Sequence, residues 1–170
     1  MGRLDNVEMW CSRFKDWKID TRNQKFGSTA LNIAAYVGPR KLELVRYLVE
    51  KQNASVHCLN KSGTSAFILA CENEDADPKV IRYLLENTDV NVNRKIISQS
   101  IKWKVLRGVA KLAVRFKMNQ SELIRRVAEG AGLTALHYAA RRGDMEIVEL
   151  LLERGAKPST TNDLGRDVLS

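Results

Sequence analysis

The sequence is short of the residues that build metal sites, disulfide frameworks and membrane spans. It holds three cysteines, none in C-x-x-C spacing, and two histidines, which argues against a zinc or disulfide framework and a histidine-rich metal site. Its longest apolar run is Ala66–Cys71, far below the roughly 18 residues that a bilayer span requires. The N-terminal residues lack the apolar core of a secretory signal. We therefore expect a cytoplasmic or nuclear protein with reduced thiols and no transmembrane segment.

The motifs of common catalytic sites are also missing. The sequence has no Gly-rich phosphate loop, no Ser/His/Asp set and no paired-carboxylate motif. The acidic run from Glu72 to Asp77 could suggest a divalent cation such as calcium, but it has neither EF-hand spacing nor the glycine that such a loop needs. We predict a solvated loop there, no metal, no cofactor and no enzymatic activity.

The positive charge is concentrated in one stretch. The chain of 170 residues has a formal net charge of +8. Between residues 94 and 129 it has ten basic and two acidic side chains, so the rest of the sequence is neutral overall. This distribution predicts a local basic feature rather than a protein that coats nucleic acid along its whole surface.

A repeated pattern runs through the sequence. The segments Gly27–Ala35, Gly63–Cys71 and Gly132–Ala140 share one order: Gly, any residue, Thr or Ser, Ala, large apolar, any residue, large apolar, and two small residues. A shortened copy starts at Gly165. The lead glycines recur every 33 to 36 residues or so, and the gap between the second and third copies spans about two periods. A degenerate copy therefore fits between them.

Each clear copy continues with a second apolar pattern at helical spacing. These patterns cover residues 42–50, 80–86 and 145–153, and a short polar stretch of turn character follows each. Apolar residues at i, i+3, i+4 and i+7 predict a helix with one buried stripe. The repeating unit is therefore a helix, a turn, a second helix and an extended turn.

The sequence resembles the ankyrin-repeat family. Gly132–Ser159 carries the family's Thr-Pro-Leu-His tetrapeptide with Ala135 in place of proline, followed by its second-helix pattern. The resemblance implies an all-α, ankyrin-like helix-turn-helix solenoid, an α-α repeat superhelix that binds partners without catalysis. It also implies that His137 links neighbouring units through backbone hydrogen bonds.

The expected organisation is a single ankyrin-repeat domain over residues 1–170. Because the last copy stops within its first helix, we expect this chain to be part of a longer protein. The expected parts are a degenerate N-terminal cap helix and turn (1–26), repeats at 27–60, 61–93 and 132–164, a degenerate basic repeat or insertion (94–131), and the start of a truncated repeat (165–170).

The resemblance also implies which residues face a partner. They lie just before and after the lead glycine and just after the pair of small residues. In this sequence they are Lys25, Phe26, Ser28, Tyr36, Val37, Ser62, Thr64, Glu72, Asn73, Leu133, Arg141 and Arg142. Two alternatives remain: Phe26 could pack beneath its turn, and the arginine pair could be a solvated rim.

The basic stretch is predicted to start with one long helix over residues 97–117. Its apolar side chains recur every three to four residues and are expected to fill the core, while Lys104, Arg107, Lys111 and Arg115 form a basic face within an arc of about 80°. A second helix is predicted over 121–129. The basic face could be solvated, meet an acidic protein, act as a calmodulin-like target, or contact anionic membrane or nucleic acid.

The sequence as a whole predicts a non-catalytic protein-interaction module, a scaffold or adaptor. It would use the concave repeat surface and the basic helical face, with an acidic protein as partner. The alternatives are an electrostatic docking module for nucleic acid or anionic membrane, and the targeting part of a longer enzyme or signalling protein. No oligomeric state is predicted.

Overall fold

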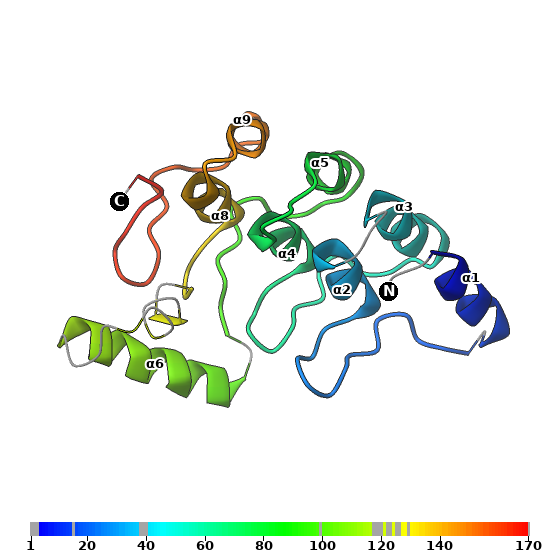
Figure 1. Ribbon diagram of the computed structural model, residues 1–170, viewed down its shortest axis with the longest axis horizontal. Coiled ribbons are helices and arrows are strands. Elements are labelled where there is room, and N and C mark those ends of the chain that lie inside the picture. Colours follow the sequence, from blue (N-terminus) through cyan, green and yellow to red (C-terminus); the bar gives the residue numbers. More distant parts are fainter. Residues whose placement is uncertain are drawn as a thin grey trace. The chain divides into compact units, whose positions relative to one another are not determined.

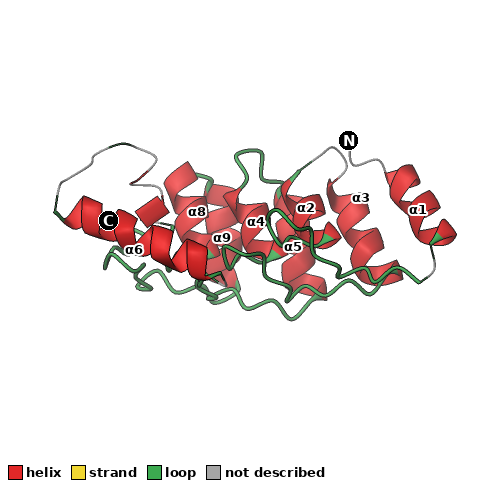
Figure 2. Cartoon of the chain, turned by 90° about the horizontal axis from the view of Figure 1, so that it is seen from below, coloured by secondary structure: helices red, strands yellow, loops and turns green. Residues whose placement is uncertain are grey.

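The computed structural model describes residues 4–14, 16–37, 41–98, 100–116, 121, 124, 127–128 and 130–169. Every regular element in these ranges is helical (Figures 1 and 2). None of the described helices is long and apolar enough to cross a membrane. The chain divides into two compact units: Met1–Asn60 with Ser65–Val90, and Lys61–Thr64 with Asn91–Ser170.

The first unit is built from paired helices. Its α2 and α4 lie side by side, and α3 packs against α2 and α5 (Figure 1). Its elements are α1 (Leu4–Arg13), α2 (Ala30–Tyr36), α3 (Lys41–Arg46), which continues into the π-helical turn η1 (Tyr47–Lys51), α4 (Ala66–Glu72) and α5 (Pro78–Asn87). The apolar positions of the repeat pattern form its core, and the largest fully buried side chains include Leu31, Leu48, Phe67, Ile68, Ile81 and Leu84.

Side-chain caps begin the helices of the first unit where the sequence predicts them. The Thr29 hydroxyl accepts the Asn32 N–H (3.3 Å), and the Asn32 side-chain oxygen accepts the Thr29 N–H (3.0 Å). Ser65 starts α4 in the same way by accepting the Ile68 N–H. Asn32 also donates to the carbonyl of Cys58 at 3.2 Å. These bonds satisfy amides that a helix N-terminus otherwise leaves unpaired.

The terminal helix α1 has no buried residue. Its tryptophan and the aromatic residues that follow it pack on one another instead. The ring centroids of Trp10 and Phe14 are 4.9 Å apart, and those of Trp10 and Trp17 are 4.6 Å apart. The apolar spacing thus forms an aromatic cluster at the protein surface.

The second unit contains α6 (Ile101–Arg115), α8 (Ala135–Arg142) and α9 (Met145–Glu153). The last two are packed as a helical hairpin, whose turn is Gly143 in the left-handed conformation (φ 73°). Leu136, Ile147 and Leu151 are almost completely buried there. In Figure 1, α6 lies apart from this hairpin.

An extended segment precedes α6 and joins two glycine turns of the second unit. Ile96 donates its N–H to Leu133 (2.9 Å) and accepts from the Gly132 N–H (3.0 Å), while Ser100 donates to the carbonyl of Lys61 (3.2 Å). Gly63 has a φ of 86°, and a Cβ on it would collide with the Ile97 carbonyl. Backbone pairing of this segment sets the start of α6.

The prediction of a helix over 97–117 is therefore too long at its N-terminal end. Ile96–Ser98 is extended because its backbone bonds the glycine turns, and α6 begins only at Ile101. The helix predicted over 121–129 lies mostly outside the described residues, as does Lys117.

Candidate interaction surfaces

An apolar patch on α2 faces solvent in the first unit. Ile33, Tyr36 and Val37, which we call the α2 patch, are 48%, 41% and 57% exposed. They are spaced by three and four residues, so they share one side of the helix end. The Asn73 side chain donates to the Tyr36 carbonyl and fixes this end of α2 against α4. The structure thus brings together Tyr36 and Asn73, two of the predicted partner-facing residues.

The electrostatics at Tyr36 keep its side chain uncharged. Burial of part of the ring, and then the nearby carboxylates of Glu72 and Glu74, raise the pKa of the phenol. Tyr36 therefore offers a neutral hydroxyl on an aromatic ring. Such a side chain is typical of protein interfaces.

The turn before α2 holds Phe26 outward. Phe26 is 54% exposed, so the alternative that it packs beneath its turn is wrong. The Asn23 side-chain oxygen accepts the N–H groups of Phe26 (2.7 Å) and Gly27 (3.1 Å), which shapes the turn. The Lys25 ammonium lies 5.1 Å from the Phe26 ring centroid. Lys25 is exposed, and Ser28 beside Gly27 is half-buried.

Two of the predicted partner-facing residues are buried in the second unit. Thr64 is 3% exposed and Leu133 is 6% exposed. The reason is the pairing of the glycine turns with the extended segment, since the Leu133 carbonyl accepts from Ile96. Ser62 is half-buried and its hydroxyl lies 3.1 Å from that of Thr64. For Thr64 and Leu133 the prediction of a partner-facing position is wrong.

The two arginines at the end of α8 have different surroundings. Arg141 is exposed, with its guanidinium 5.1 Å from the Tyr138 ring centroid. Arg142 is half-buried and forms an ion pair with Asp144 at 3.2 Å. A cavity of about 300 Å³ adjoins Arg141 and is also lined by His137, Arg166 and Val168. Of the pair, Arg141 is the side chain available to a partner.

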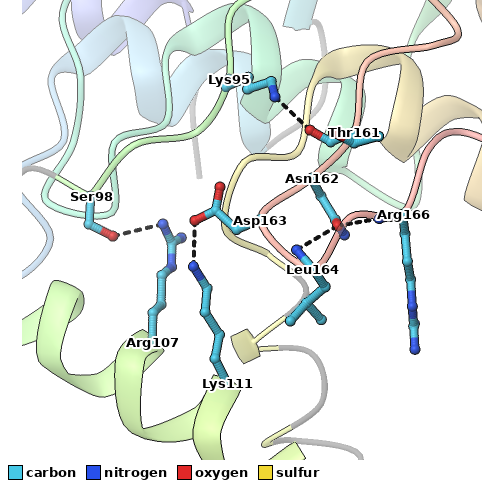
Figure 3. Close-up of polar contacts among 9 residues, drawn as sticks. All are labelled: Lys95, Ser98, Arg107, Lys111, Thr161, Asn162, Asp163, Leu164 and Arg166. Atoms are coloured by element: carbon cyan, nitrogen blue, oxygen red, sulfur yellow. Dashed lines mark hydrogen bonds and ion pairs between the residues drawn. The ribbon is translucent and has the colours of Figure 1, made fainter. Parts of the chain in front are cut away.

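The α6 helix is oriented opposite to the prediction. Arg107 is only 9% exposed, and its Nη1 donates to the Ser98 hydroxyl at 2.7 Å (Figure 3). The Lys111 ammonium pairs with the Asp163 carboxylate at 2.5 Å (Figure 3). Lys104 and Arg115 are exposed. The four predicted basic-face residues therefore divide into two inward and two outward side chains.

The apolar side chains of α6 point to solvent. Ile101, Val105, Val109, Leu112 and Phe116 are between 55% and 78% exposed, so the prediction that they fill the core is wrong. The physical reason is the surface that α6 meets. That surface offers the Ser98 hydroxyl and the Asp163 carboxylate, which bind cations. A cavity of about 250 Å³ beside these groups is lined by Lys104, Arg107 and Lys111 among others.

Comparison with known proteins identifies the repeats. A family model described as "Ankyrin repeats (3 copies)" matches residues 2–96, and one described as "Ankyrin repeat" matches residues 131–163. The chain belongs to the ankyrin-repeat family. These two matches leave residues 97–130 between them, and that interval contains α6. The family and the all-α solenoid class predicted from the sequence are thereby confirmed.

One relative is a protein of Acanthamoeba polyphaga mimivirus that is named as an ankyrin repeat protein. It is 43% identical over 44 residues, which cover 26% of this chain and 11% of the relative. The matched part of the chain thus spans about a tenth of that relative's length.

The ankyrin histidine has a structural environment. The Nδ1 atom of His137 accepts the Thr134 N–H at 3.2 Å and lies 2.8 Å from the Thr134 hydroxyl. His137 is 7% exposed. Burial lowers its pKa, and the backbone of Arg166 acts more weakly in the opposite direction. Asn32 makes the same reciprocal contacts with Thr29 at the corresponding position of the first ankyrin repeat.

The other histidine forms a contact that the sequence did not suggest. The Nε2 atom of His57 lies 3.0 Å from the Asp89 carboxylate, and both side chains are exposed. No local motif joins these residues, because the contact links turns of successive repeats. Cys71 is buried, while Cys11 and Cys58 are half-buried. Within the described ranges there is no group of three or more His, Cys, Asp or Glu side chains that could hold a metal ion.

Proposed function

We propose that this chain is a non-catalytic adaptor that anchors a partner protein on the α2 patch. Its ankyrin repeats are protein-interaction modules. The observation that carries the proposal is the exposure of Ile33, Tyr36 and Val37 on a helix end that is fixed by Asn73. Exposed aromatic and apolar side chains on a rigid support are the usual anchors of protein interfaces, because little side-chain entropy is lost on binding.

The proposed partner carries acidic groups. Exposed cations support this assignment, since Lys25 stands beside Phe26 in the first unit and Arg141 stands over Tyr138 in the second. In each unit a cation lies next to an aromatic ring, a combination that can hold a carboxylate beside an apolar contact. The basic helical face contributes through Lys104 and Arg115 only, because Arg107 and Lys111 bind groups of their own unit.

We also propose the repeat bounds that the sequence suggested. The proposed repeats 27–60, 61–93 and 132–164 each include a pair of helices, namely α2 with α3, α4 with α5, and α8 with α9. The interval 94–131 is then a degenerate basic repeat that contains α6. This division is supported by the positive φ of Gly27, Gly63 and Gly132 at the start of each complete repeat.

The test is capture from a lysate of the source cells with three versions of the full chain. They are the unchanged protein, a Tyr36→Asp/Val37→Asp variant, and a Met145→Asp/Leu152→Asp control. Met145 and Leu152 are 63% and 42% exposed on α9, so the control changes two exposed apolar residues outside the patch. Circular dichroism first establishes that all three fold.

We expect the first variant to lose one set of acidic proteins by about 30-fold, as befits an anchoring contact of about 2 kcal/mol, while the control retains them. Equal retention by all three versions would overturn the α2 patch as the anchor. Retention of nucleic acid alone, lost by orders of magnitude between about 50 and about 200 mM salt, would instead favour an electrostatic docking module.

A further inference from the structure

The outward surface of α6 is a continuous apolar stripe. Ile101 is 78% exposed, Val105 and Val109 are 60% exposed, Leu112 is 55% exposed and Phe116 is 65% exposed. At 100° per residue these five side chains fall within an arc of about 80°. A stripe of this size on one helix is uncommon on a protein surface that faces only water.

Basic side chains border the stripe on both sides. Lys104 and Arg115 lie along one edge and Lys102 lies along the other, and all three are exposed. The sequence has no Asp or Glu between Val90 and Ser121. Every formal charge on α6 is therefore positive, and the exposed part combines apolar area with cations at its margins.

Contacts on the inner side fix the rotation of α6. Ala110 is 5% exposed, Arg107 binds the Ser98 hydroxyl, and Lys111 pairs with Asp163 (Figure 3). The Arg107 guanidinium also lies 5.8 Å from the Trp103 ring centroid. Turning the stripe inward would break these contacts and place apolar groups against Ser98 and Asp163. The stripe is consequently held outward by the unit itself.

The charge pattern selects among possible occupants. A second copy of α6 would bring like charges together, which opposes pairing of two such stripes. Nucleic acid would meet the cations but not the apolar residues between them. An anionic bilayer satisfies both features, because apolar side chains enter the acyl boundary while lysine and arginine stems reach back to the headgroups.

We propose that α6 is a membrane-docking helix that lies in the surface of an anionic bilayer. Ile101, Val105, Val109, Leu112 and Phe116 enter the bilayer surface, and Lys102, Lys104 and Arg115 contact headgroup phosphates and carboxylates. This role goes beyond the protein-binding role of the α2 patch and is independent of it. It gives the chain a lipid surface at which a bound partner is gathered.

The test measures sedimentation of the full chain with vesicles of two compositions. One set is pure phosphatidylcholine, and the other contains about 30% phosphatidylserine, which supplies the negative surface potential that attracts cations. The charge variant is Lys102→Glu/Lys104→Glu/Arg115→Glu. Its control, Lys18→Glu/Lys51→Glu/Lys157→Glu, changes the net charge equally at exposed positions outside α6.

A second variant tests the apolar stripe separately. Val105→Ser/Leu112→Ser removes apolar area from α6, and Ile33→Ser/Val37→Ser is its control on the α2 patch. All variants are checked for folding by circular dichroism. The α2 control also separates the two roles, because it lowers partner capture without changing vesicle binding.

The unchanged chain is expected to bind the anionic vesicles and not the neutral ones. Charge reversal should weaken binding by about 100-fold or more, since each cation near such a surface contributes about five-fold. The serine variant should weaken it by at least about ten-fold, while both controls stay close to the unchanged protein. Absence of binding by the folded unchanged chain, or equal losses in the controls, would overturn the proposal. A purified protein that binds α6 while vesicles do not would also overturn it and assign the stripe to a protein partner.

Discussion

Helices α6 and α8 carry similar amphipathic patterns but bury opposite sides. In α8 the apolar residues are inside, with Leu136 1% exposed and Ala139 0% exposed. In α6 the apolar residue Leu112 is 55% exposed, whereas the cation Arg107 is 9% exposed. Periodicity therefore reveals that a helix has two sides, but the surface it meets decides which side is buried.

The surfaces differ in chemistry. α8 packs on α9, whose Ile147 and Leu151 are apolar and fully buried. α6 meets Ser98 and Asp163, whose oxygens accept hydrogen bonds from cations. A buried guanidinium or ammonium needs such partners, while a buried leucine needs apolar atoms. The comparison can be sharpened by changing matched positions in the repeats and in α6.

The largest expected contrast is between two leucines of the second unit. Leu136→Ala in α8 should lower the free energy of unfolding by about 2–5 kcal/mol, because it opens a cavity in a packed core. Leu112→Ala in α6 should change it by less than about 0.5 kcal/mol, since the side chain is exposed. Urea titrations followed by circular dichroism measure both. Comparable losses would show that the α6 stripe is buried.

The next contrast concerns two glycines. Gly63→Ala should destabilise the protein by about 1–3 kcal/mol, because position 63 has a positive φ and its Cβ would collide with the Ile97 carbonyl. Gly108→Ala in α6 should stabilise it by roughly 0.5–1 kcal/mol, because a Cβ there meets no atom within 4 Å. Thermal unfolding of the two variants should shift in opposite directions. A shift in the same direction would contradict the described setting of one of them.

A smaller contrast is expected at the helix starts. Thr29→Ala should cost about 1 kcal/mol, because it removes the hydroxyl that accepts the Asn32 N–H. Ser100 precedes α6 but makes no side-chain capping bond, so Ser100→Ala should be nearly neutral. Thr29→Ser, which keeps the hydroxyl, serves as the control in denaturant titrations. A loss at Ser100 equal to that at Thr29 would mean that α6 is capped like a repeat helix.

The smallest expected effect is a pH dependence that belongs to α8 and has no counterpart in α6. Burial lowers the pKa of His137 in the folded state, so below about pH 6.5 the unfolded chain binds a proton that the folded chain resists. This contribution to stability is present above the unfolded-state pKa and is lost as the pH falls.

His137→Asn introduces the residue that the first repeat uses at the same place. The stability of the unchanged chain relative to this variant should therefore fall between about pH 8 and about pH 5. Unfolding midpoints measured across that range give the difference directly. A difference that is constant with pH would contradict a depressed His137 pKa.

Much of the fold could be predicted because the repeat pattern ties local and tertiary structure together. Thr29 and Ser65 mark helix starts, and the small pair Ala34 and Ala35 is buried where successive helices meet. The same residue types therefore specify both the helix and its neighbour. Where the pattern is present, the sequence predicted helices, core and family correctly.

The candidate surfaces were less predictable. Thr64 and Leu133 hold pattern positions that face a partner in an ideal repeat, but pairing with the Ile96 segment buries them. The orientation of α6 depends on Ser98 and Asp163, which are remote from it in the repeat pattern or the sequence. No local periodicity contains that information.

The orientation of α6 is the central claim, and cysteine labelling at two neighbouring positions tests it most directly. Val109 is 60% exposed and Ala110 is 5% exposed. The Val109→Cys and Ala110→Cys variants are made in a chain with Cys11→Ser, Cys58→Ser and Cys71→Ala, and reaction with a maleimide dye is timed. The account predicts that position 109 reacts at least about ten times faster than position 110. Equal rates, or faster reaction at position 110, would contradict it.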